Sequence, residues 1–303
     1  MRGNRGVTTA GIDRLGSAVM PDLLRVGGAS SARHEPARLS PTTLLRGRLV
    51  GRLRDRFEYR LTVIEAGAGF GKSTLLSQAV HENRIEQIGI DTLLRVVETD
   101  RSVDQLLDGL AEALDVGDGE VTIDRLADAV WAKAPASVAV IIDDAHRLGD
   151  ADEAWAVLRR LLDHLPSNGH LVVSGRQVRI PTARLLSQDD ALVLTEADLA
   201  FDDDEVAAMA ELRSIPPALA AELPRWPALA TLIGVVGRAA SFEYVWDEVL
   251  RALSDERRRA LAAIVPFGEI DDDLDVRAAE ARELLSDVEE DVAEAEAEAA
   301  GAP

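Results

Sequence analysis

Cysteine is absent from this sequence of 303 residues, which excludes disulfides, zinc–thiolate sites and thiol nucleophiles. Aromatic residues make up only 4% of the chain, so Leu, Val, Ile and Ala must supply most of its core. No run of about 18 apolar residues occurs, so we expect no membrane-spanning helix. The first 40 residues also lack the apolar block of a secretory signal. These absences predict a cytoplasmic protein in a reducing compartment.

Lysine is scarce as well, and acidic residues outnumber basic ones 54 to 33, so the formal net charge is −21. A surface this acidic repels phosphate backbones, so we do not expect the chain itself to bind DNA. Lysine occurs only at Lys72 and Lys133, whereas arginine is frequent. Lys72 stands in a glycine-rich turn, where a compact ammonium on a flexible stem serves better than a planar guanidinium.

Apolar periodicity predicts an α/β architecture. Dense apolar runs predict five strands, at 60–67, 87–91, 137–146, 170–176 and 191–199. Helical spacing predicts helices at 44–57, from residue 73 onwards, and at 102–114, 122–134 and 153–165. In the first helix Leu49, Leu53 and Phe57 share one face, and Ser102 and Thr122 can cap two others. Strands that alternate with helices are typical of a parallel sheet flanked by helices.

The glycine-rich turn has the pattern of a phosphate-binding loop. Residues 66–73 read AGAGFGKS and fit [AG]xxxxGK[ST], with Ala66 in place of the first glycine of the strict form. Backbone N–H groups can curl around a phosphate only where side chains are small, and Gly69 and Gly71 allow this approach. The helix that follows adds the positive end of its dipole. The alternative is a glycine-rich surface loop.

The three residues that end the loop suit nucleotide binding. Lys72 can reach the β- and γ-phosphates, Ser73 can ligate Mg²⁺, and Thr74 can bond the α-phosphate. We therefore expect ATP or ADP, with Mg²⁺, as the cofactors.

Two acids follow the apolar run VAVII at the end of the third predicted strand. Asp143 can hold Mg²⁺ through water, and Asp144 can orient or deprotonate the attacking water. The alternative is a solvated pair of acids at a strand end. Arg176 follows the fourth strand, and if that strand lies beside the first, its side chain can sense the γ-phosphate. His146 can either pair locally or act on substrate.

The motifs taken in order resemble the ATPase module of signal-transduction ATPases with numerous domains. The nearest subgroup is the large ATP-binding LuxR-type regulators of the maltose-activator type, and the matching stretches are LLRGRLVGRL, LTVIEAGAGFGKSTLL, VAVIIDDAHRL, LVVSGR, LTEADLAFDDDEV and RWPALATL. The resemblance implies a nucleotide-binding set of Arg46, Arg48, Gly67, Gly69, Gly71, Lys72, Ser73, Thr74 and Pro227. It implies catalytic roles for Asp144, Lys72 and Arg176, and metal ligation by Ser73 and Asp143.

The resemblance also divides the chain. It implies a P-loop ATPase domain at 41–200, a helical domain at 201–240 and a partial winged-helix region at 241–268. Residues 1–40 are expected to be disordered, or an overlong start of the reading frame, and 269–303 form an acidic tail. That tail is either a solvated segment or a decoy for basic partner surfaces. The helical-repeat sensor and C-terminal helix-turn-helix of the regulators are not expected here, so inducer and DNA binding are not carried over.

Three functions remain open at this point. The first is an ATP/ADP switch with slow Mg²⁺-dependent hydrolysis, related to a LuxR-type transcriptional regulator. The second is a non-hydrolysing scaffold that titrates full-length regulators through shared ATPase surfaces; Arg225 favours it, because the family's Gly-x-Pro element has glycine there. The third is a ring-forming remodeller, which needs an arginine finger. We expect the chain to associate with itself or with related regulators, and we expect no membrane as a partner.

Overall fold

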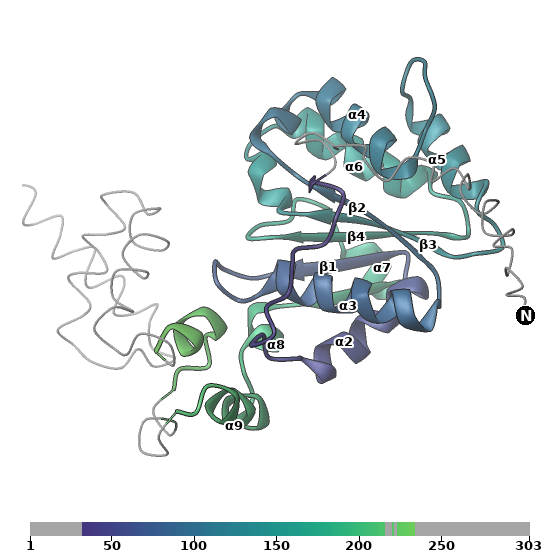
Figure 1. The fold of residues 1–303 in the computed structure, drawn as a ribbon. Helices are drawn as coiled ribbons and strands as arrows, with labels where there is room; N and C mark the ends of the chain where they lie inside the picture. Colours follow the sequence, from purple (N-terminus) through teal and green to yellow (C-terminus); the bar gives the residue numbers. More distant parts are fainter. Residues whose placement is uncertain (1–31, 216–219, 221–222, 234–303) are drawn as a thin grey trace, which may run out of the picture.

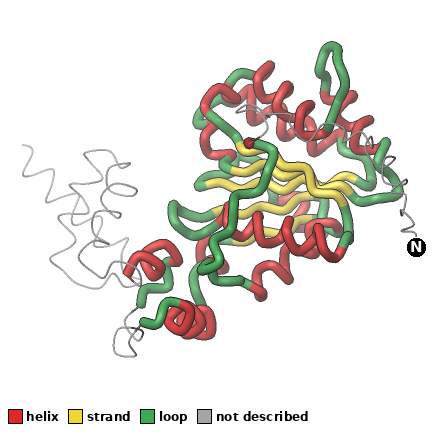
Figure 2. The backbone as a smooth tube through the Cα atoms, viewed as in Figure 1, coloured by secondary structure: helices red, strands yellow, loops and turns green. Residues whose placement is uncertain are grey.

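The computed structural model describes residues 32–215, 220 and 223–233. Its centre is a five-stranded sheet in the order β2-β3-β4-β1-β5, in which every adjacent pair is parallel. The strands are β1 Leu61–Glu65, β2 Ile90–Arg95, β3 Val138–Asp143, β4 Gly169–Gly175 and β5 Ala191–Leu194. Figure 2 shows these strands as a central layer between helices. The prediction of a parallel sheet flanked by helices is confirmed.

Helices cover both faces of the sheet. The helices in the described residues include α2 Gly47–Arg54, α3 Lys72–Glu86, α4 Val103–Leu114, α5 Ile123–Trp131, α6 Asp152–His164, α7 Ala183–Ser187, α8 Glu196–Leu199 and α9 Asp203–Leu212. In Figure 1, α4, α5 and α6 lie on one face, and α2 and α3 lie on the other.

Alternation along the strands divides the core between the two faces. In β3, Val138, Val140 and Ile142 pack with α4, α5 and α6, whereas Ala139 and Ile141 pack with α2 and α3. Successive strand residues point to opposite faces, so a strand covered on both sides needs a continuous apolar run. All six residues of β3 are accordingly buried.

The second strand corrects one prediction. The strand expected at 87–91 lies at Ile90–Arg95 instead. Gln87 ends α3 in the left-handed conformation, with φ at 54°. The backbone N–H groups of the next two residues donate to the Asn83 side chain, at 3.1 and 3.3 Å. Residues 87–89 therefore form a turn held by Asn83, and the sheet begins only after it.

Other boundaries differ less. The strand expected at 191–199 ends at Leu194, because Thr195 and Asp198 form a capping box that starts α8. The Thr122 hydroxyl caps α5 by accepting from the Arg125 N–H, as expected, but Ser102 makes no side-chain cap on α4. The apolar face of α2 is confirmed, since Leu49 and Leu53 are buried, and Phe57 is buried in the 3-10 turn that follows the helix.

Ordered packing starts earlier than residue 41. The Arg95 N–H donates to the Arg33 carbonyl at 2.8 Å, and Arg33 forms an ion pair with buried Asp100. The prediction of disorder up to residue 40 is therefore wrong for this part. Residues 1–31, the partial winged-helix region at 241–268 and the acidic tail at 269–303 lie outside the described residues.

Beyond the sheet, α9 and a helical turn at 227–233 form a small helical part (Figure 1). Its apolar contacts include Ala210, Ile215, Leu223 and Ile233. In the described portion of the chain, no helix has the length and apolarity needed to cross a membrane.

Candidate nucleotide-binding site

The glycine-rich turn joins β1 to α3 at the carboxyl edge of the sheet. Gly69 and Gly71 have φ of 77° and 78°, in the left-handed region that glycine adopts without penalty. Gly71 is the N-cap of α3, so Lys72 and Ser73 open the helix. Ligands of open parallel sheets bind at this edge, where backbone N–H groups and the helix dipole favour an anion.

Lys72 is buried in the loop, with 8% of its surface exposed. Its ammonium donates to the carbonyls of Ala66 and Gly67, both at 2.7 Å. Burial, followed by the charge of Arg176, lowers the pKa of Lys72, although nearby acids oppose the shift. The side chain is thus held at the loop by two neutral acceptors, which phosphate oxygens can replace.

An acid that the sequence did not single out also contacts the loop. The Glu196 carboxylate accepts the Gly67 N–H at 2.9 Å, and its charge is among those that raise the pKa of Lys72. Glu196 is the first residue of α8, directly after β5. Since β5 pairs with β1, its carboxyl end lies beside the loop. The sequence signal was an acid at a strand end, like the two acids after the third strand.

Asp143 ends β3 and is almost completely buried, with 1% exposed. Its Oδ1 accepts the Ser174 hydroxyl at 2.5 Å and the Asp144 N–H at 3.0 Å. The Arg95 Nε lies 3.7 Å from its Oδ2. The neighbouring strands β2 and β4 therefore hold this carboxylate in one orientation. Ser174 belongs to the stretch LVVSGR. Its role could not be predicted from the sequence, because it depends on the pairing of β4 with β3.

Asp144 has a left-handed backbone, with φ at 58°, which turns the chain sharply after β3. Its side chain is more accessible than that of Asp143, with 24% exposed. Arg176 follows β4, which pairs with β1 as the sensing role requires. The charges of Asp143, Asp144 and Arg176 all act on Lys72, so the structure brings these four predicted residues together.

His146 belongs to the same neighbourhood. Burial lowers its pKa, the charge of Asp144 opposes this shift, and the charges of Arg176 and Lys72 add to it. Its Nδ1 is buried and has no hydrogen-bond partner among the described residues. A neutral imidazole beside Asp144 is the state that these surroundings favour.

The helical part also contacts the phosphate loop, through Trp226 and Ala228. The Trp226 Nε1–H donates to the Ala68 carbonyl at 2.9 Å, and the Trp226 ring stacks on Phe70 with centroids 6.3 Å apart. The Ala228 N–H donates to the Gly69 carbonyl at 3.0 Å. The phosphate loop is therefore held by a segment more than 150 residues away in sequence.

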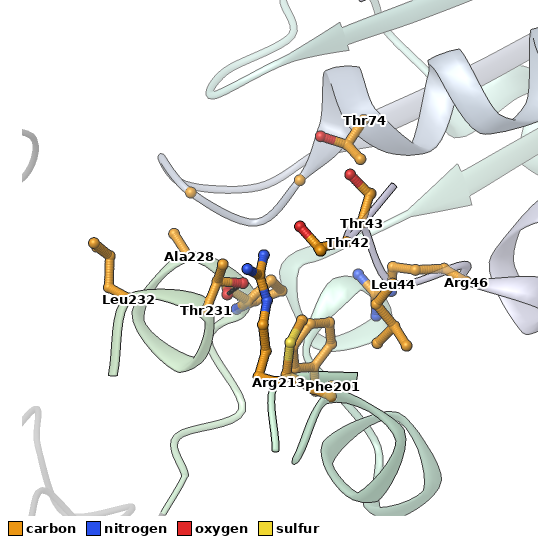
Figure 3. A pocket seen from close by; sticks show the side chains of 14 residues that line it. Thr42, Thr43, Leu44, Arg46, Thr74, Phe201, Arg213, Ala228, Thr231 and Leu232 are labelled. Atoms are coloured by element: carbon orange, nitrogen blue, oxygen red, sulfur yellow. Dashed lines mark hydrogen bonds between the residues drawn. The ribbon is translucent and has the colours of Figure 1, made fainter. Parts of the chain in front are cut away.

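A cavity of about 420 Å³ lies between the loop and the helical part. Figure 3 shows its lining, in which Thr74 lies on the α3 side and Arg213, Thr231 and Leu232 on the helical side. The full lining is Thr42, Thr43, Leu44, Arg46, Gly69, Gly71, Thr74, Phe201, Met209, Arg213, Pro227, Ala228, Thr231 and Leu232. Its volume lies in the range of small-molecule pockets. Of the predicted nucleotide contacts, the cavity includes Arg46, Gly69, Gly71, Thr74 and Pro227.

Two of the arginines predicted to bind nucleotide, Arg46 and Arg48, contact the helical part. The Arg46 guanidinium forms two hydrogen bonds with Glu205, at 3.0 and 2.7 Å, and lies 4.9 Å from the centre of the Phe201 ring. Arg48 does not line the cavity and pairs with Asp202 and Glu205. Arg46 thus forms a wall of the cavity, and the structure does not bring Arg48 to it.

Arg225, where the resemblance implied a glycine, contacts the helical part. Its Nη1 donates to the Phe201 carbonyl at 3.0 Å, and its Nη2 pairs with Asp203 at 2.6 Å. The Phe201 N–H in turn donates to the Arg225 carbonyl at 2.7 Å. This residue connects two segments of the helical part.

The donors present fit a magnesium nucleotide. No group of three His, Cys, Asp or Glu side chains that could hold a metal by itself occurs in the described residues. Mg²⁺ usually takes one or two protein oxygens and completes its shell with phosphates and water. Ser73 provides such an oxygen at the loop, and Asp143 provides one at the carboxyl end of β3.

The parallel sheet, the glycine-rich loop after β1 and the acids after β3 define a P-loop NTPase-like fold. Comparison with known proteins agrees: a family model described as AAA domain matches residues 54–180. A solved structure described as the Walker-type ATPase PABY2304 of Pyrococcus abyssi superposes with a TM-score of 0.53 and 15% identity, covering 82% of this chain and 91% of that one.

Two curated proteins are similar in sequence. One is the serine/threonine-protein kinase PknK of Mycobacterium tuberculosis (strain ATCC 25618 / H37Rv), 30% identical over 199 residues, which cover 59% of this chain and 18% of PknK. The other is the HTH-type transcriptional regulator MalT of Serratia proteamaculans (strain 568), 24% identical over 286 residues, which cover 80% of this chain and 31% of MalT. The chain thus spans a third or less of the lengths of these relatives.

Proposed function

We propose that this chain is an ATP/ADP-binding switch that hydrolyses Mg-ATP slowly. The observation that carries the proposal is the cavity of about 420 Å³, which the phosphate loop and the helical part line together. A nucleotide there contacts both parts at once. Their arrangement can then depend on which nucleotide is bound, since a ligand shifts a conformational equilibrium through its different affinity for the two states.

The predicted residues take the following roles in this proposal. Lys72 exchanges its two carbonyl acceptors for phosphate oxygens, and Thr74 bonds the α-phosphate. Asp144 orients or deprotonates the attacking water, because it is the accessible acid beside Lys72. Arg176 senses the γ-phosphate from the end of β4.

The metal completes the site. Ser73 and Asp143 are the proposed ligands, and Mg²⁺ when bound neutralises charge on the β- and γ-phosphates. The Ser174 hydroxyl keeps the Asp143 carboxylate oriented through its hydrogen bond of 2.5 Å. In this proposal Asp143 binds and positions Mg²⁺, whereas Asp144 acts on the attacking water.

The similarity to a transcriptional regulator and to a protein kinase supports a place in regulation. We propose that the switch acts by association with copies of itself or with related regulators, rather than by binding DNA itself. The net charge of −21 supports this, because it opposes contact with a phosphate backbone.

The first test is the nucleotide content of protein purified without added nucleotide, followed by turnover with Mg-ATP. Co-purified ADP and slow turnover that Lys72→Ala abolishes are the expected results. Lys133→Ala is the matched control, since it removes the other lysine of the chain, at the end of α5. A protein that binds neither ATP nor ADP would sink the proposal.

A non-hydrolysing scaffold is the second candidate. Arg225 favours it, because its side chain is engaged with Phe201 and Asp203 of the helical part. Tight ADP binding with no turnover, unchanged in Asp144→Asn, would support the scaffold over the switch.

A further inference from the structure

Arg213 follows α9 and enters the cavity from the helical part. Figure 3 shows its side chain extending into the space between Thr42 and Thr231, toward the side formed by the loop and Thr74. Its Nε is buried and has no hydrogen-bond partner in the described part of the chain. The sequence drew no attention to this residue, since it stands outside every motif.

Arg213 is half-buried, and its surroundings differ from those of the buried arginines Arg46 and Arg56. Arg46 pairs with Glu205, and Arg56 pairs with Asp91 at 2.8 Å. The lining of the cavity contains no Asp or Glu, and none of the described residues forms an ion pair with Arg213. A partly buried cation is costly unless an anion or hydrogen-bond acceptors complete it. Among the described residues, the cavity therefore contains a cation with no acidic side chain in its lining.

The anion can be identified from the rest of the lining. Gly69 and Gly71 of the phosphate loop and Thr74 of the first turn of α3 line the same cavity, so this edge of the loop borders it. A nucleotide held by that loop places its α- and β-phosphates at this edge. Guanidinium binds phosphate through paired, charge-assisted hydrogen bonds, which makes arginine the suitable side chain for this contact.

The base has a different place in the cavity. Phe201 and Met209 supply an apolar surface, and Leu44 packs against them. Such a surface suits an aromatic ring and offers nothing to a charged phosphate. This division leaves the phosphate chain as the part of the ligand within reach of the guanidinium.

We propose that Arg213 binds the α- or β-phosphate of the nucleotide and thereby couples the helical part to nucleotide binding. This inference rests on the proposed nucleotide site and adds a contact from outside the phosphate loop. Because Arg213 follows α9, its bond to phosphate would stabilise the contact between the helical part and the phosphate loop while ADP or ATP is bound.

The test compares Arg213→Ala with the wild type by titration with ADP and with adenosine. We expect the Kd of ADP to rise about 10- to 100-fold and that of adenosine to change less than about twofold, because adenosine lacks phosphate. Equal losses for both ligands would overturn the proposal, since they would place Arg213 at the base or ribose. Arg184→Ala is the control, because it removes an exposed arginine of α7.

A second measurement covers the case in which adenosine binds too weakly to titrate. The ³¹P NMR spectrum of bound ADP should show a shifted α- or β-phosphorus resonance in Arg213→Ala and an unchanged spectrum in Arg184→Ala. Identical spectra in wild type and Arg213→Ala would also overturn the inference.

Thermal unfolding separates this contact from a structural role. Without nucleotide, Arg213→Ala should have the Tm of the wild type or a higher one, because an unpaired cation is removed. Its rise in Tm on adding ADP should be smaller. If wild type and Arg184→Ala bind no ADP, the proposed function itself fails. If both bind it and Arg213→Ala binds it equally well, only the role of Arg213 is refuted.

Discussion

The Trp226 indole N–H donates to the Ala68 carbonyl at 2.9 Å, and so connects the helical part to the phosphate loop. The same indole stacks on Phe70, with an angle of 23° between the rings. One aromatic side chain thus restrains both the backbone and a side chain of the loop. A loop that is held in its binding conformation loses less entropy when a nucleotide binds.

Trp226→Ala should therefore raise the Kd of ADP by about tenfold, because a hydrogen bond and an aromatic contact together contribute about 1–3 kcal/mol. Trp226→Phe keeps a ring for the stack and loses only the N–H donor, so its Kd should lie between those of wild type and Trp226→Ala. Titration calorimetry measures all three. An unchanged Kd in Trp226→Ala would show that this contact does not organise the loop.

Substitutions of Asp143 and Asp144 should affect different measurements. Asp144→Asn should lower kcat for Mg-ATP by about 10²–10⁴-fold and leave the Kd of ADP nearly unchanged, because Asp144 acts on water. Asp143→Asn should weaken the dependence of binding on Mg²⁺, because the buried carboxylate held by Ser174 is the proposed metal ligand. Steady-state turnover and titration with and without Mg²⁺ distinguish the two. If Asp143→Asn lowered kcat and Asp144→Asn changed the Mg²⁺ dependence instead, the two proposed roles would have to be exchanged.

Gly71 and Gly51 provide a matched pair of substitutions. Gly71 has φ at 78° with no atom within 4 Å of an added Cβ, so Gly71→Ala is strained by its backbone alone. We expect a loss of about 1–2 kcal/mol in the free energy of unfolding. Gly51 lies inside α2 with equal space, so Gly51→Ala should stabilise by about 0.5–1 kcal/mol. Urea denaturation gives both values, and two effects of the same sign would contradict the conformational argument.

Asp198 makes stability depend on pH. Burial by itself raises its pKa, but hydrogen bonds from the Thr195 N–H, Arg52 and the Thr195 hydroxyl outweigh burial and lower the pKa to about 2. A pKa that is lower in the folded chain stabilises it above the unfolded value of 3.8. That contribution is lost as the pH falls from about 4 through about 2.

Asp198→Ala should accordingly cost about 1 kcal/mol at neutral pH, since it removes the capping box of α8. The difference from wild type should shrink as the pH falls through this range. Asp108→Ala, which removes an exposed acid of α4, should show neither effect. Denaturation at several pH values measures this, and a difference that grows on acidification would refute the assignment.

Much of the site could be predicted from local sequence because its parts are adjacent in the chain. The loop needs small residues, a lysine and a hydroxyl at fixed spacing, so residues 66–74 carry that information by themselves. Asp143 and Asp144 end an unbroken apolar run, and that run is typical of a strand covered on both faces. The boundary of β2 was missed because Asn83, at the end of α3, holds the turn that precedes it.

The sequence by itself determined the fold class, the loop and the acids, since periodicity and spacing act over a few residues. Only the tertiary structure decided that Glu196 meets Gly67, that Arg46 holds Glu205, and that Arg213 enters the cavity without an acid beside it. The first two contacts join residues 129 and 159 positions apart. The physical reason is that the order of strands and the docking of the helical part bring distant residues together, and no local pattern encodes either.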